Sequence, residues 1–145
     1  MRKRSEMAAE AFSQRYNCAQ SVIMAFPELT EGMKETVLKQ AFGFGGGMGR
    51  LQETCGALTG AYMVIGLWKG SGTPDEVRKE SINKNIQDIT AEFRSKWGTS
   101  SCHDLLGLDL NTVEGQELHN SLQQREKVCE KCVISAVNYL TDLIK

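Results

Sequence analysis

The sequence predicts a single all-α domain over residues 1–145, a helical bundle of about five helices with a glycine-rich loop before the third. Apolar residues recur with helical spacing along most of the chain. No segment alternates apolar and polar residues over the length of a strand, and no Asn-Gly or Asp-Gly hairpin turn occurs. A chain of 145 residues has an ordinary single-domain length and can bury a core without disulfides.

The five helices are expected over residues 5–26, 30–42, 54–68, 73–97 and 118–144. The first carries an apolar face made of Ala8, Phe12, Ala19, Val22, Ile23 and Phe26. The fourth carries an inward face made of Val77, Ile82, Ile86, Ile89 and Phe93.

Local signals set several of these boundaries. Pro27 ends the first helix, because proline cannot donate the backbone hydrogen bond that a helix interior needs. Thr54 is a plausible N-cap of the third helix, and Thr73 followed by Pro74 is a typical helix start. Ser101 can cap a short turn that begins at Cys102.

The stretch from Phe42 to Leu67 is the most unusual part of the chain. It holds eight of the 14 glycines, at positions 43, 45, 46, 47, 49, 56, 60 and 66. The first five predict a loop, because glycine is unfavourable in a regular helix. Gly56 and Gly60 share one side of the following helix and would let another backbone come close. Cys55 is expected in the first helical turn, where the helix dipole favours a thiolate.

Charge and hydropathy restrict the function. The 18 acidic and 17 basic residues nearly cancel, so the chain lacks the basic character of nucleic-acid-binding proteins. The longest apolar run, residues 61–67, is far shorter than the ~20 residues of a membrane span. No apolar segment of a signal peptide follows the basic N-terminus. We therefore expect a cytoplasmic protein that binds neither nucleic acid nor membranes.

Five cysteines are many for such a protein, and a reducing cytosol makes a static disulfide framework unsuitable. Metal binding or redox chemistry is the better use, although cysteines also serve as small buried apolar residues. They are spread over the predicted elements, at positions 18, 55, 102, 129 and 132. Any site that uses four of them must be assembled by tertiary folding.

Other motifs do not fit. The glycine loop lacks the Lys-Ser/Thr of a P-loop and the spacing of a dinucleotide-binding loop. Cys129 and Cys132 form a C-x-x-C pair inside a predicted helix, without the βαβ pattern of a thioredoxin. His103, next to Cys102, could act as a base or a metal ligand, whereas His119 has less to recommend it.

Several motifs together resemble the redox-active protein family named for its C_GCAxxG_C_C cysteine pattern. They are Asn17-Cys18-Ala19, Phe44-Gly45-Gly46-Gly47-Met48-Gly49-Arg50, Cys55-Gly56-Ala57-Leu58-Thr59-Gly60-Ala61, Cys102-His103-Asp104-Leu105-Leu106-Gly107, and Cys129 with Val133 and Ala136. The resemblance runs from about residue 8 to residue 140 and implies four functional cysteines: Cys18, Cys55, Cys102 and Cys129. Cys132 is additional to this pattern.

Three functions compete. In the first, these four thiolates bind an iron–sulfur cluster or another thiophilic metal for electron transfer, and the backbone N–H groups of Gly45, Gly46, Gly47 and Gly49 hydrogen-bond the cofactor. In the second, the protein is a thiol–disulfide oxidoreductase with Cys55 as the attacking thiolate and Cys102 as the resolving thiol. In the third, the cysteines only pack within a helical interaction module.

Both chemical hypotheses require the cysteines to converge near the glycine loop, because scattered thiols can neither share a metal nor exchange a disulfide. The resemblance also implies a redox partner protein, an oxidoreductase or a transporter-associated protein. Of the three functions, we expect the first, with an iron–sulfur cluster rather than zinc, because the backbone N–H groups of the glycine loop can hydrogen-bond cluster sulfides.

Overall fold

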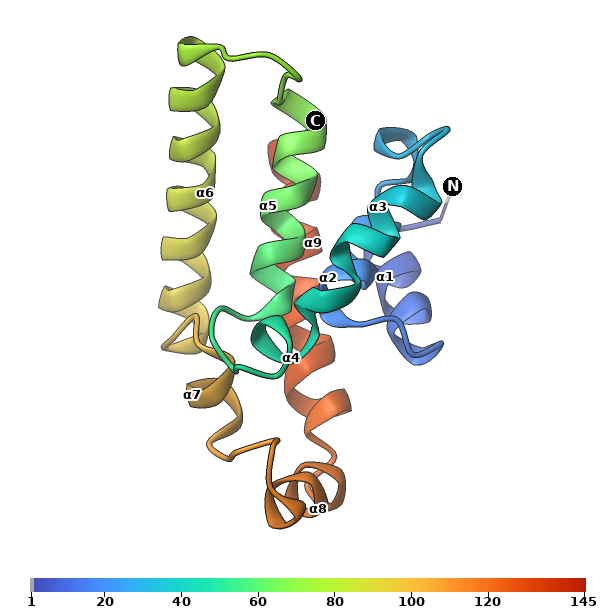
Figure 1. Ribbon diagram of the computed structural model, residues 1–145, viewed down its shortest axis with the longest axis vertical. Helices are drawn as coiled ribbons and strands as arrows, with labels where there is room; N and C mark the ends of the chain where they lie inside the picture. The colour runs from blue at the N-terminus through green and yellow to red at the C-terminus, as the bar shows by residue number, and fades with distance from the viewer. Residues whose placement is uncertain (1) are drawn as a thin grey trace.

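The computed structural model describes residues 2–145, and within this range the chain is helical with no β-strand (Figure 1). The prediction of an all-α fold is confirmed. The α-helices are α1 (Arg4–Ser13), α2 (Cys18–Met24), α3 (Lys34–Ala41), α4 (Gly45–Met48), α5 (Gly56–Lys69), α6 (Glu76–Trp97), α7 (Cys102–Leu106), α8 (Val113–Ser121) and α9 (Glu130–Leu143). Short 3₁₀ turns η1 (Pro27–Leu29) and η2 (Phe42–Phe44) and a π-helical turn η3 (Arg125–Cys129) complete the order.

Helix α5 is the centre of the fold. It packs on α2, α6 and α9, and Figure 1 shows α6 running alongside it while α1 and α2 lie on the other side. Its buried residues join one apolar core with α1, α2, α6 and α9, in which the largest fully buried side chains are Phe26, Phe93, Ile23, Leu58, Ile65, Ile89 and Leu140. Val77, which was predicted to face inward, is 82% exposed, because it lies in the first turn of α6, beyond the part that packs on α5.

Two glycines on α5 allow the close approach to α2 that the sequence predicted. A Cβ atom at Gly56 would lie 2.8 Å from Cβ of Cys18, and one at Gly60 would lie 2.7 Å from the carbonyl oxygen of Ala19. Real Cβ atoms essentially never come this close. The small residues of α5 therefore set the position of α2 and of Cys18 at its first turn.

The structure has more helices than the expected five. Two predicted helices are each divided, α7 is a short helix at the turn predicted from Cys102, and the short element α4 lies in the glycine loop, where Gly46 and Gly47 have left-handed rather than α-helical angles. The helix predicted over residues 5–26 breaks after α1, where Arg15 adopts a left-handed φ of 77°. Asn17 then starts α2 with a reciprocal capping box, in which its side chain accepts from the backbone N–H of Gln20 and the Gln20 side chain accepts from the Asn17 N–H. This cap satisfies helix-terminal donors and stabilises a new helix at Cys18.

The helix predicted over residues 118–144 is divided in the same way. Gln123 has a left-handed φ of 52°, which separates α8 from the continuous η3 and α9. The N-cap of α8 is Thr112, whose side chain accepts from the N–H of Gly115. The second predicted helix also begins later than expected, at Lys34, because residues 31–33 form a turn in which Gly32 has a left-handed φ of 79°. Among the helices of residues 2–145, none has the length and apolar character needed to cross a membrane.

Candidate functional site

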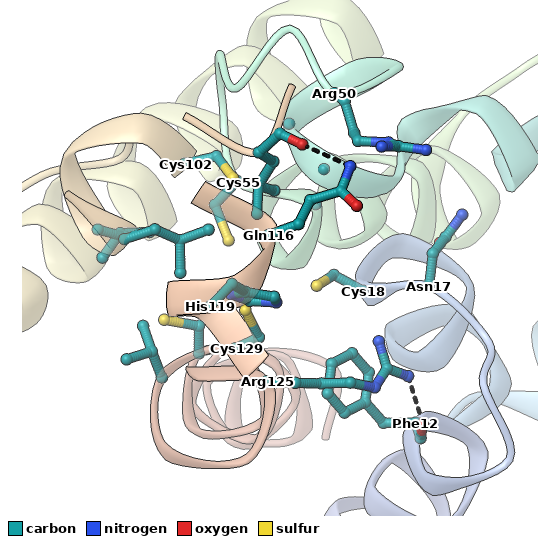
Figure 2. Close-up of a pocket in the computed structure, with 18 of the residues that line it drawn as sticks. Phe12, Asn17, Cys18, Arg50, Cys55, Cys102, Gln116, His119, Arg125 and Cys129 are labelled. Carbon is teal, nitrogen blue, oxygen red and sulfur yellow. Dashed lines mark hydrogen bonds between the residues drawn. The ribbon is translucent and has the colours of Figure 1, made fainter. Parts of the chain in front are cut away.

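All five cysteines line one cavity of about 530 Å³. They come from different elements: Cys18 from α2, Cys55 from the residue before α5, Cys102 from α7, Cys129 from η3 and Cys132 from α9. Figure 2 shows the sulfur atoms of Cys18, Cys55 and Cys102 turned toward the interior of this cavity. Folding thus gathers residues that are up to 114 positions apart, from 18 to 132, around one space.

The glycine-rich loop forms one wall of the cavity and winds in the left-handed sense. Gly46 and Gly47 have φ/ψ of 63°/33° and 66°/48°, and Met48, Gly49 and Arg50 also have positive φ. A Cβ atom at Gly47 would lie 2.7 Å from Cβ of Cys102. Glycine at position 47 thus permits both the turn and the approach of Cys102.

The segments that carry Cys55 and Cys102 are joined through their backbones. The Cys55 N–H donates to the Ser100 carbonyl at 2.8 Å, and the Cys102 N–H donates to the Glu53 carbonyl at 2.7 Å. Thr54 forms an isolated antiparallel bridge with Ser101. Thr54 is therefore not the N-cap of α5, as the sequence suggested. Cys55 itself occupies the N-cap position, one residue before the first turn in which it was expected.

Cys18 and Cys129 form the first of two interacting thiol pairs. Hydrogen bonding to Cys129 and burial raise the pKa of Cys18 well above its ordinary value. The same hydrogen bond, with the nearby guanidinium of Arg125, lowers the pKa of Cys129. A Cys18 thiol that donates to a Cys129 thiolate accounts for both directions. Both residues are only partly buried.

Cys55 and Cys132 form the second pair, which lies deeper. Hydrogen bonding from Cys132 lowers the pKa of Cys55, and the backbone N–H groups of Ala57 and Leu58 in the first turn of α5 act in the same direction. The pKa of Cys132 is raised by the same hydrogen bond and by burial. Cys132 is fully buried and Cys55 is 6% exposed. Cys55 thus interacts most with Cys132, the cysteine that is additional to the four-cysteine pattern, and not with Cys102.

Cys102 is the one cysteine of the cavity that belongs to neither pair. Burial is the main cause that raises its pKa, to about 12, with smaller contributions from the charges of Cys55 and Cys129. It stays a protonated thiol at neutral pH. Its predicted role as the resolving thiol for Cys55 stays a prediction.

Within residues 2–145, no group of three or more His, Cys, Asp or Glu side chains is placed to hold a metal ion. Cys18, Cys55, Cys102 and Cys129 nevertheless line one cavity and carry the soft thiolate ligands that thiophilic metals prefer. Of the glycines expected to contact a cofactor, Gly46 and Gly47 line the cavity, while Gly45 and Gly49 line a shallower depression beside it.

The histidine of the cavity is His119, and not His103. His103 is exposed and does not line the cavity. The Nε2 group of buried Gln124 donates to the Leu106 carbonyl at 2.8 Å, which leaves its Oε1 atom to accept from Nδ1–H of His119 at 2.9 Å. In the neutral ring, Nε2 of His119 is then free to accept a proton. No spacing pattern in the sequence marks His119, rather than His103, as the histidine of the cavity. Its contact with Gln124 is visible only in the structure.

Comparisons with known proteins agree with the cysteine pattern. The family model described as "Putative redox-active protein (C_GCAxxG_C_C)" matches residues 16–143. No curated protein and no solved structure matches the chain. Since the match covers nearly the whole chain and includes all the cysteines of the cavity, the protein belongs to the C_GCAxxG_C_C family of redox-active proteins.

Proposed function

We propose that this protein is a thiol–disulfide redox protein that uses the Cys18–Cys129 pair to reduce a disulfide. The observation that carries the proposal is that five free cysteines line one cavity. The directions of their pKa shifts support a division into two pairs, each with one member favoured as thiolate and the other as thiol. A nucleophile and a resolving thiol need this division of roles.

Exposure favours Cys129 over Cys55 as the first nucleophile. Cys18 and Cys129 are half-buried, whereas Cys55 and Cys132 are buried. Access limits exchange as much as thiolate character does. In this proposal Cys55, which the sequence predicted as the attacking thiolate, does not attack the substrate first. It forms a second, more deeply buried pair with Cys132.

The reaction balances in two steps. The Cys129 thiolate attacks one sulfur of the substrate disulfide, an S–S bond forms to Cys129, and the other half leaves as a thiolate. Cys18 then loses its proton and attacks the Cys129 sulfur, which forms a Cys18–Cys129 disulfide and releases the second half as a thiolate. Two electrons pass from the dithiol to the substrate, and each released thiolate takes up a proton.

His119 is suited to the second step, because Nε2 of its neutral ring can accept the proton that Cys18 must lose. Renewed turnover requires a dithiol reductant. In this proposal a redox partner protein supplies it. The family resemblance implies such a partner, an oxidoreductase or a transporter-associated protein, and it would have to carry a dithiol.

An iron–sulfur cluster or another metal remains the competing function, supported by the number of thiols around one cavity. Anaerobically purified protein should be analysed for iron, zinc and sulfide, and its free thiols counted before and after a disulfide oxidant. We expect a colourless protein without stoichiometric metal that loses thiols two at a time. Stoichiometric iron with absorbance near ~400 nm, abolished in Cys55→Ser, would instead establish a cluster.

A further inference from the structure

The cavity that holds the thiols carries positive charge at its walls. Its lining includes three arginines, Arg15, Arg50 and Arg125, and among residues 2–145 no Asp or Glu side chain lines it. The protein as a whole has a formal net charge of −1, so this local excess is not a reflection of overall composition. A concave site with charge of one sign raises the local concentration of ligands of the opposite sign.

Arg15 and Arg50 are available to a ligand. Both are exposed, and no carboxylate in the described part of the chain pairs with either one. Both adopt left-handed backbone conformations, with φ of 77° and 58°. Such conformations are uncommon for long side chains and concentrate at functional sites.

The local structure directs Arg50 along the cavity wall. A Cβ atom at Gly46 would lie 2.7 Å from Cγ of Arg50, so the aliphatic part of Arg50 occupies the space that glycine leaves. Figure 2 shows Arg50 and Arg125 at the cavity with Cys18 between them in this view.

Arg125 is held in place by contacts that use only part of its guanidinium. Its Nη2 group donates to the Phe12 carbonyl at 2.6 Å and to the Tyr16 carbonyl at 3.3 Å. Its Cζ atom lies 3.7 Å from the centroid of the Phe12 ring. This fixed cation lies near Cys129, whose pKa it lowers.

We propose that the substrate is a small disulfide that carries carboxylates, bound with its carboxylates on Arg15 and Arg50 and its S–S bond toward Cys129. This inference rests on the thiol–disulfide function proposed above. The planar guanidinium matches a carboxylate with two parallel hydrogen bonds. A cavity of about 530 Å³ has the size of a small-molecule site. The covalent steps are those already given.

The test compares three disulfides of different charge on the reduced protein: 3,3′-dithiodipropionate, neutral 2-hydroxyethyl disulfide and cationic cystamine. Each second-order rate of thiol loss is divided by the rate of the same disulfide with dithiothreitol, which removes differences in intrinsic reactivity. We expect the normalised rate of the dianion to exceed that of the neutral disulfide at least tenfold and that of cystamine by more. The preference should shrink as salt rises.

Variants identify the cations responsible. Arg15→Gln and Arg50→Gln should each reduce the preference for the dianion severalfold, and Arg50→Lys should retain part of it. Lys127→Gln removes the same charge from η3 outside the cavity lining and should leave the preference unchanged. Equal normalised rates for all three disulfides would overturn the substrate class and leave the thiol function standing. Failure of every disulfide to oxidise the protein would overturn both.

Discussion

Gly47 and Cys102 are so close that a Cβ atom on the glycine would lie 2.7 Å from Cβ of the cysteine. The same atom would lie 2.7 Å from Cα of Gln52. The shape of this part of the cavity therefore depends on the left-handed glycine turn. The absence of a side chain at Gly47 leaves the space that Cys102, at the start of α7, occupies.

Gly47→Ala should lower the free energy of unfolding by about 2–5 kcal/mol. A left-handed conformation costs a non-glycine residue ~1–2 kcal/mol, and overpacking adds ~1–3 kcal/mol. Gly49→Ala is the matched control, because Gly49 has a φ of 61° but no atom within 4 Å of its Cβ position. Urea unfolding should show a loss of only ~1–2 kcal/mol for this control. Equal losses in the two variants would contradict the close packing of Gly47 on Cys102.

Cys132→Ala should raise the pKa of Cys55, because it removes the hydrogen bond that contributes most to lowering it. A hydrogen bond to the charged form stabilises the thiolate, so its loss should move the inflection to higher pH. The measurement is the rate of iodoacetamide labelling at Cys55 against pH, followed by mass spectrometry. Cys132→Ser keeps a donor and should shift the inflection less. An unchanged inflection in the alanine variant would show that the two thiols do not interact.

Cys102 should make stability fall at alkaline pH. Its pKa is about 12 in the folded protein, against an ordinary value of 9.0. Because the folded value is raised, its contribution to stability is complete below pH 9 and is lost as the pH rises toward 12. The stability advantage of the wild type over Cys102→Ala should therefore shrink between pH 8 and about pH 10.5. Urea unfolding under reducing conditions measures it, and a constant or growing difference would refute the raised pKa.

His119→Asn should slow the release of the second substrate half by about 10²-fold, the usual contribution of a general base. The first attack should be little affected, because Cys129 is already favoured as a thiolate. The mixed disulfide on Cys129 should then accumulate and be visible by quenched mass spectrometry. His103→Asn is the control, since His103 does not line the cavity. If His119→Asn slows both steps equally, or neither, His119 is not the base for Cys18.

The helical period of the sequence predicted the fold class, because burial of an apolar face is a local property of each helix. It did not predict the breaks at Arg15 and Gln123, where non-glycine residues take left-handed conformations without any glycine or proline. A signal for the first break was present in the capping pair Asn17 and Gln20, three residues apart. The sequence still predicted one continuous helix, because the apolar face of residues 5–26 continues across the break at Arg15.

The sequence predicted that the cysteines converge, but it did not predict which of them interact. Cys18, Cys55, Cys102 and Cys129 all line the cavity, as convergence near the glycine loop required. The partnership of Cys55 with Cys132 depends on how α9 packs against the start of α5, which spacing does not encode. The same holds for His119, because its Nδ1 contact is made with a buried amide five residues later in the chain, Gln124.

The most direct test of the account is to map the disulfides that form when the reduced protein is oxidised by one equivalent of disulfide. Tandem mass spectrometry of the digested, alkylated protein should find the Cys18–Cys129 bridge first and, with excess oxidant, the Cys55–Cys132 bridge. Cys102 should remain alkylated as a free thiol throughout. A first bridge between Cys55 and Cys102, or protein whose thiols stay free while iron or zinc is bound, would contradict the account.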